Sequence, residues 1–230
     1  MTQQLTAIVQ KASRAHSATV FFFHGLGDSG SGWSPVGTQI SREVPHVKFI
    51  FPNAPDKPIT INGGAVMPAW YDIHALGDIN NMMKSREDEQ GLLASIAAAN
   101  SLIREEIGSG IPSNRIVVGG FSQGGAMALA IGLTSEYPFA GIISLSGYIP
   151  CRKKILMMST ETNKKTPIFM GHGDWDMVVP HQFGKETSNL LQENGYSVNF
   201  KTYEGMGHSS DVEEIRNVTE FLKRVIPALN

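Results

Sequence analysis

The sequence predicts one α/β domain with a mostly parallel central sheet and helices on both faces. Apolar runs of β-branched and aromatic residues alternate along the chain with segments of helical periodicity, which is typical of strands joined by crossover helices. The 230 residues are enough for one sizeable core. No internal repeat or linker divides the chain. We therefore expect residues 1–230 to form a single domain.

The first predicted strand covers residues 18–23 (ATVFFF), an unbroken apolar run of the kind that is buried in parallel sheets. The segment 24–32 (HGLGDSGSG) follows, and its glycine content predicts a loop rather than a regular element. It is not a phosphate-binding P-loop, because no Gly-Lys-Ser/Thr follows it. A second strand is predicted at 47–51, where Pro52 ends it.

Residues 52–83 are predicted to form a long loop, because their apolar side chains follow neither a period of two nor one of 3.6. The segment is too apolar for a disordered linker. It fits a cover over one flank of the core, an adaptable apolar groove beside a site, or a dimer contact. Its large apolar members are Ile61, Val66, Met67, Trp70, Tyr71, Ile73, Leu76, Ile79, Met82 and Met83.

The remaining segments alternate between helix and strand. The basic runs at 152–154 and 164–165 are predicted to be solvated loop charges. The other predicted elements are a helix at 89–107, a strand from Arg115, a helix after Ser122, strands at 139–145 and 166–171, a helix at 183–194, a strand at 197–203 and a helix at 210–226.

Composition excludes several classes of protein. The net charge of −2 is scattered, which argues against a nucleic-acid footprint or a polybasic membrane anchor. No apolar window approaches the ~18 residues of a membrane span, and no secretion signal opens the chain. Cys151 is the only cysteine, which fits a reducing compartment and leaves open a buried or an acylated thiol. We expect a soluble protein of the cytoplasm, and also of the nucleus, that meets membranes only transiently.

The segment 119–125 (GGFSQGG) predicts a nucleophile elbow. The chain must reverse from strand to helix at Ser122, which strains its backbone, and Gly120 and Gly124 relieve the resulting crowding. The hydroxyl would project above the carboxyl edge of the sheet, beside the positive end of a helix. G-x-S-x-G alone also fits an ordinary turn, but the flanking strand and helix favour Ser122 as a nucleophile.

A serine nucleophile needs a base, and the base needs an orienting carboxylate. His208 is the predicted base, because it lies in the last strand-to-helix loop among glycines that leave it room to approach Ser122. Asp174 and Asp176 are both candidates for the acid. We favour Asp176, which lies just before Met-Val-Val-Pro and reaches toward the last strand. Serine, aspartate, histidine is the order found in α/β-hydrolases.

Other polar groups have different expected roles. His24 and His172 directly follow strands, and we expect both to bind loop backbone. No metal or cofactor is predicted, because no His-Glu-x-x-His or comparable spacing occurs. Backbone N–H groups of Gln123, after the nucleophile, and of Leu26, in the glycine-rich loop, are the predicted oxyanion donors.

Seven segments together resemble the lysophospholipase/carboxylesterase family, and they span nearly the whole chain in the right order. They are FHGLGD, PNAP, MPAWYD, GIPSNR, GGFSQGG, HGDWD and FKTYEGMGHS. The resemblance implies an α/β-hydrolase fold without a large lid. It also implies hydrolysis of S-palmitoyl thioesters on proteins through an acyl-serine, with lysophospholipids and short esters as further substrates.

By position in those motifs, the family's triad falls on Ser122, Asp176 and His208, and its oxyanion amides on Leu26 and Gln123. The residues implied for the acyl channel are Trp70, Ile73 and Leu76. The segment SGYIP departs from the animal members, which carry a cysteine and a tryptophan there, and this bears on acyl-chain preference.

Two rival functions use the same residues. A carboxylesterase or lysophospholipase would apply the same triad to oxygen esters, and a non-catalytic member would hold acylated tails in its groove. The presence of all three triad residues argues against the second rival. The physiological substrates and the choice between a monomer and a weak homodimer stay open at the level of sequence.

Overall fold

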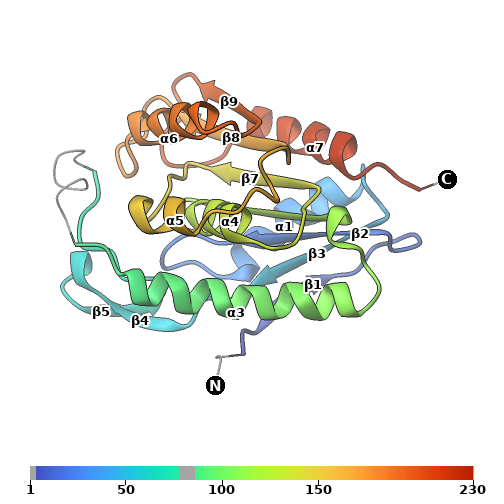
Figure 1. Ribbon diagram of the computed structural model, residues 1–230, viewed down its shortest axis with the longest axis horizontal. Helices are drawn as coiled ribbons and strands as arrows, with labels where there is room; N and C mark the ends of the chain where they lie inside the picture. The colour runs from blue at the N-terminus through green and yellow to red at the C-terminus, as the bar shows by residue number, and fades with distance from the viewer. Residues whose placement is uncertain (1–3, 78–85, 230) are drawn as a thin grey trace.

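The computed structural model describes residues 4–77 and 86–229, and seven of its strands form one central sheet with the order β1-β3-β2-β6-β7-β8-β9 (Figure 1). All neighbouring strands are parallel except β1, which runs antiparallel to β3. This sheet confirms the predicted α/β class. The strands are β1 (Ala7–Gln10), β2 (Ala18–Phe23), β3 (Val47–Pro52), β6 (Ile116–Phe121), β7 (Gly141–Leu145), β8 (Ile168–Gly173) and β9 (Val198–Tyr203).

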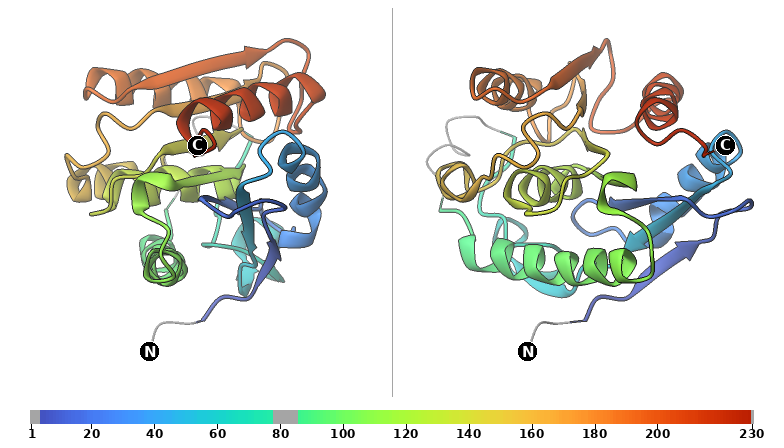
Figure 2. Two further views of the ribbon diagram at one scale, coloured as in Figure 1. Left: turned by 90° about the vertical axis from the view of Figure 1, so that its right-hand side faces the viewer. Right: turned by 45° about the vertical axis from the view of Figure 1, so that its right-hand side comes forward.

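Helices cover both faces of the sheet (Figure 2). On one face, α1 (Gly30–Ser41) and α7 (Val212–Val225) pack over an apolar cluster that includes Phe49 and Phe169. The other face carries α3 (Glu89–Gly108), α4 (Gln123–Thr134), α5 (Arg152–Met158) and α6 (His181–Glu193). The α4 helix is buried over nearly its whole length, so it is a core element. None of the helices in the described ranges combines the length and hydropathy of a membrane-spanning helix.

The predicted loop at 24–32 is wrong from Gly30 onward, because α1 begins there. A glycine- and proline-containing helix is locally weak, but its small residues let it lie close to β3. A Cβ on Gly30 would lie 2.4 Å from the Phe51 carbonyl oxygen, and one on Gly37 would lie 2.4 Å from Phe51 Cζ. Packing therefore stabilises a helix that the sequence pattern does not predict.

The predicted loop at 52–83 also contains regular structure. Strands β4 (Asp56–Ile59) and β5 (Ala65–Pro68) pair as an antiparallel hairpin, joined through the short 3-10 helix Thr60–Asn62. A second 3-10 turn, Ser113–Arg115, precedes β6. The edge strand β1 was not predicted either. Of the apolar residues of that loop, Ile79, Met82 and Met83 lie outside the described residues.

Two further expectations need correction. The basic run at 152–154 opens the helix α5 instead of lying in a loop, and Lys154 pairs with Glu89 of α3 at 3.0 Å. Strand β8 continues two residues beyond its predicted end, so that His172 belongs to the strand and is buried. The buried part of β8 therefore extends to Gly173, three residues before Asp176.

A buried carboxyl group lies between α7 and the sheet. The Glu214 side chain is fully buried, and neither of its oxygens has a hydrogen-bond partner within the described residues. A Cβ on Gly171 would lie 2.3 Å from Glu214 Oε1, so glycine makes room for the carboxyl group. Burial, with a further contribution from the charge of Asp211, raises the pKa of Glu214 to about 8.

Because folding raises this pKa to about 8, the Glu214 carboxyl group is mostly neutral in the native protein at neutral pH. The native state should lose stability as pH rises from the unfolded value, roughly 4.3, toward about 8, by at most about 1.4 kcal/mol per pH unit. The substitution Glu214→Gln should flatten this dependence and stabilise the protein at pH 8.5 by about 2 kcal/mol or more. Urea unfolding from pH 5 to 8.5 measures the effect.

The matched control is Glu213→Gln, since Glu213 is the exposed neighbour and pairs with Lys201 at 2.6 Å. This variant should keep the wild-type pH dependence. Equal pH slopes for Glu214→Gln and the wild type would contradict a neutral buried Glu214.

Candidate active site

Ser122 lies at the sharp turn between β6 and α4. Its φ of 55° and ψ of −121° are strained for a residue with a side chain. A Cβ on Gly120 would lie 2.3 Å from the Gly124 carbonyl oxygen, and a Cβ on Gly124 would lie 1.9 Å from the Phe23 carbonyl oxygen. The two glycines are therefore required for the turn, and the turn places the Ser122 hydroxyl at the carboxyl edge of the sheet.

The structure brings together the three predicted side chains. Ser122 Oγ lies 2.8 Å from His208 Nε2, and His208 Nδ1 lies 2.7 Å from Asp176 Oδ2. Because an ionised carboxylate only accepts hydrogen bonds, Nδ1 carries the proton of the neutral imidazole. Nε2 is then free to accept the Ser122 hydroxyl proton, which is the arrangement that general-base activation of a serine needs.

The Asp176 carboxylate is buried in a shell of donors. Its Oδ1 accepts the N–H groups of Val178 and Val179, each at 2.9 Å, and His172 Nε2 lies 3.3 Å from its Oδ2. Burial alone would raise the pKa of Asp176, but hydrogen bonds from His172, His208 and the Val178 amide outweigh burial and hold the pKa below its ordinary value. The group is therefore ionised at neutral pH and orients the imidazole.

The neighbouring aspartate has a different contact. Asp174 is exposed, and its Oδ1 accepts the Gly205 N–H at 2.7 Å, so it braces the turn after β9. The structure thus joins Asp176, and not Asp174, to His208.

His24 and His172 bind loop backbone, as predicted. His24 Nδ1 donates to the Gly25 carbonyl at 2.7 Å, and its Nε2 accepts the Ala54 N–H at 3.0 Å. His172 Nε2 donates to the Val179 carbonyl at 2.8 Å. Within the described residues, no three His, Cys, Asp or Glu side chains cluster as metal ligands do.

The two residues whose amides are predicted as oxyanion donors lie in the same pocket as the hydroxyl. Leu26 and Gln123 line the same pocket as Ser122. Gln123 is the first residue of α4, so its N–H has no acceptor within the helix. A Cβ on Gly25 would lie only 3.4 Å from Ser122 Cβ, which shows how closely the glycine-rich loop approaches the turn.

The pocket beside Ser122 encloses about 220 Å³. Ile73 and Leu76 lie in its wall, where the resemblance placed the acyl channel. Trp70 does not, and this part of the expectation is corrected, because its side chain is fully buried and its Nε1 donates to the His24 carbonyl at 2.8 Å. The other lining residues are Gly25, Leu26, Asp28, Phe121, Gln123, Tyr148, Val178, Val179 and His208.

Sequence reasoning missed five of these as lining residues, namely Asp28, Phe121, Tyr148, Val178 and Val179. Phe121 adjoins the nucleophile, and the two valines follow the catalytic-acid candidate, so position beside a predicted site residue is the signal that could have found them. Tyr148 belongs to the segment SGYIP, whose departure from the animal members is the sequence signal that points to the acyl-binding region.

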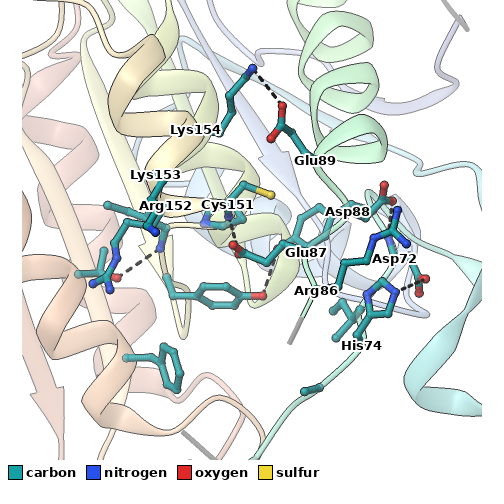
Figure 3. A pocket seen from close by; sticks show the side chains of 18 of the residues that line it. Asp72, His74, Arg86, Glu87, Asp88, Glu89, Cys151, Arg152, Lys153 and Lys154 are labelled. Carbon is teal, nitrogen blue, oxygen red and sulfur yellow. Dashed lines mark hydrogen bonds and ion pairs between the residues drawn. The ribbon is translucent and has the colours of Figure 1, made fainter. Parts of the chain in front are cut away.

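A second and larger cavity, of about 450 Å³, shares Ile73 and Tyr148 with this pocket. Many of its lining side chains are charged, and Glu89 of α3 faces Lys154 of α5 there (Figure 3). Glu87 accepts the Cys151 N–H at 2.6 Å. The Cys151 thiol is buried, which raises its pKa to about 12, so it is a poor nucleophile.

The family model described as phospholipase/carboxylesterase matches residues 4–226. The chain belongs to this family. Acyl-protein thioesterase 1 of Neurospora crassa is 50% identical over 216 residues, which cover 92% of this chain and 88% of the relative. Family membership makes the chain a hydrolase and agrees with the predicted resemblance.

Two crystal structures of similar proteins share the fold of this family member. Arabidopsis thaliana SOBER1 has a TM-score of 0.85 and 34% identity, and the match covers 91% of this chain and 99% of that one. Zea mays acyl-protein thioesterase 2 has a TM-score of 0.82 and 30% identity, with coverages of 96% and 99%. The α/β-hydrolase fold is therefore confirmed, and no large lid interrupts the described part of the sheet and its helices.

The crowding at the turn predicts a large effect of Gly124→Ala. The added methyl group would collide with backbone atoms that cannot move independently, so we expect a loss of about 2 kcal/mol or more in the free energy of unfolding. Urea titration measures it. Gly108→Ala is the control, because a Cβ there meets open space and α3 should be unchanged or slightly more stable. Equal midpoints for the two variants would contradict the packing argument.

Proposed function

We propose that this family member is a serine hydrolase that removes S-palmitoyl groups from protein cysteines. The observation that carries the proposal is the hydrogen-bonded chain from Ser122 through His208 to Asp176 beside an apolar pocket. The names of the Neurospora crassa and Zea mays relatives support the thioester as substrate, since both are acyl-protein thioesterases. A carboxylesterase acting mainly on oxygen esters is less well supported.

The first half-reaction acylates Ser122. His208 Nε2 takes the hydroxyl proton while Oγ attacks the thioester carbonyl, and the carbonyl π electrons move onto oxygen. The Gln123 and Leu26 amides would donate to this oxyanion, and each donor of this kind is typically worth about 3 kcal/mol of barrier. Asp176 stabilises the imidazolium through its bond to Nδ1. The intermediate then collapses, the C–S bond breaks, and the cysteine sulfur leaves as a thiol with the proton from His208.

The second half-reaction releases the acyl chain. A water molecule gives its proton to His208 Nε2 and attacks the acyl-serine carbonyl, and collapse of this intermediate returns the proton to Ser122 Oγ. The products are a fatty acid and the regenerated serine. Because a thiol leaves readily, we expect acyl-chain binding and deacylation to limit turnover. The apolar wall that carries Ile73 and Leu76 would hold the chain.

The substitution Ser122→Ala tests the nucleophile. Removing the attacking oxygen should lower turnover of a palmitoylated peptide by about 10⁴-fold or more, without loss of the far-ultraviolet circular dichroism of the fold. Fluorophosphonate labelling should disappear with it. Retained hydrolysis by the variant would refute the assignment of Ser122. Wild-type protein that turns over a lysophospholipid faster than the palmitoylated peptide would favour the oxygen-ester rival.

A pair of aspartate variants tests the acid. Asp176→Asn should lower kcat by about 10⁴-fold, because an amide cannot hold the required imidazole tautomer. Asp174→Asn, two residues away and exposed, should change kcat by no more than about twofold. Both are read by steady-state kinetics with a soluble acyl thioester. A comparable loss in both variants would show that the loop, and not the Asp176–His208 bond, determines activity.

A further inference from the structure

Three large apolar side chains point outward around the buried carboxylate of the site. Trp175 is 71% exposed, Met177 80% and Val178 39%, whereas Asp176 between them is 4% exposed. Scattered surface hydrophobics are common, but three within four residues form a patch of the kind that marks an interaction site. We call Trp175, Met177 and Val178 the apolar rim.

The apolar rim is held in place by hydrogen bonds on both sides. The Trp175 N–H donates to the Met206 carbonyl at 3.1 Å, and the Val178 carbonyl accepts the Gly77 N–H at 2.9 Å. Asp176 Oδ1 accepts the Val178 N–H from within the turn. These bonds fix the backbone on both sides of Met177, and the exposed fractions show that the Trp175 and Met177 side chains point outward while Asp176 points inward.

The apolar rim is continuous with the pocket. Val178 is both a member of the rim and a lining residue of the cavity that contains Ser122 and Leu76. An acyl chain that enters this cavity across Val178 passes over the rim. A surface that holds a chain entering by this route lies against the rim.

We propose that the apolar rim inserts into the zwitterionic phospholipid surface from which the acyl chain is drawn. This inference rests on the proposed function, because the palmitoyl chain of an S-acylated protein is buried in a bilayer until it enters the pocket. Tryptophan suits this position, since its ring is apolar and its N–H can bind the headgroup region.

The charges around the apolar rim select the kind of lipid. Asp174 precedes the rim and Glu204 lies on the adjoining turn, which Asp174 binds through Gly205, and both acidic side chains are exposed. Their negative charge disfavours an anionic bilayer. Phosphatidylcholine is therefore the matched surface, and adding an anionic lipid should not tighten binding.

The fluorescence of Trp175 reports directly on this contact. Of its three tryptophans, Trp33 and Trp70 are buried, so Trp175 is the one that water-soluble quenchers reach. Phosphatidylcholine vesicles added to the wild-type protein should shift the emission to the blue and protect it from acrylamide. No change in emission or quenching at saturating vesicles would overturn the proposal.

The double variant Trp175→Ser, Met177→Ser tests the insertion itself. Losing two inserted apolar side chains should weaken vesicle binding at least 10-fold, on the order expected for burial of side chains of this size. Hydrolysis of a palmitoylated peptide embedded in vesicles should fall in parallel, while hydrolysis of a soluble short-chain thioester stays at the wild-type rate. Met157→Ser is the control, because Met157 is 73% exposed on α5 and lies outside the Ser122 pocket.

The outcomes separate the two proposals. Unchanged vesicle binding by the double variant would overturn the insertion, and so would a loss confined to soluble acylated proteins, because the rim would then contact the protein part of the substrate. If wild-type protein fails to hydrolyse the soluble thioester, the proposed function fails whatever the vesicles show.

Discussion

The strained backbone of Ser122 is the constraint on which the rest of the site depends. A positive φ at this residue turns the chain from β6 into α4 within one residue, and it is possible only because Gly120 and Gly124 leave room for backbone atoms that a Cβ would strike. The strain is balanced by burial of α4 in the core. As a result, the Ser122 hydroxyl lies at the start of α4, where the first N–H groups of the helix have no acceptor within the helix.

Asp176 organises the other half of the site. Its two oxygens bind the His208 ring on one side and the Val178 and Val179 amides on the other. The Asp176 carboxylate thus orients the His208 ring, and it also holds the turn at Val178 and Val179 that forms part of the pocket wall. Such a charge is stable only when its hydrogen bonds are complete. Here His172 Nε2, at the end of β8, also lies 3.3 Å from Asp176 Oδ2.

Much of this arrangement could be predicted from the sequence, because its strongest signals are local. The apolar run of β2, the periodicity of α3 and the glycines around Ser122 each encode one element. The failures have a different physical origin. The α1 helix depends on close packing against β3, and β1 is a four-residue edge strand whose partner lies some forty residues away. Composition cannot report contacts of that kind.

Trp70 shows the same limit within the site and explains how the site is held together. Its indole N–H donates to the His24 carbonyl at the start of the glycine-rich loop, and its backbone N–H donates to Gln123 Oε1. Gln123 Nε2 in turn donates to the Tyr71 carbonyl. An aromatic residue near an apolar pocket is expected to line it, but here the ring lies behind the wall and ties three segments together. The segments of Leu26 and Gln123, whose amides we propose as oxyanion donors, and the pocket wall that carries Ile73 therefore share one hydrogen-bonded support, so a displacement of the wall would be transmitted to those amides.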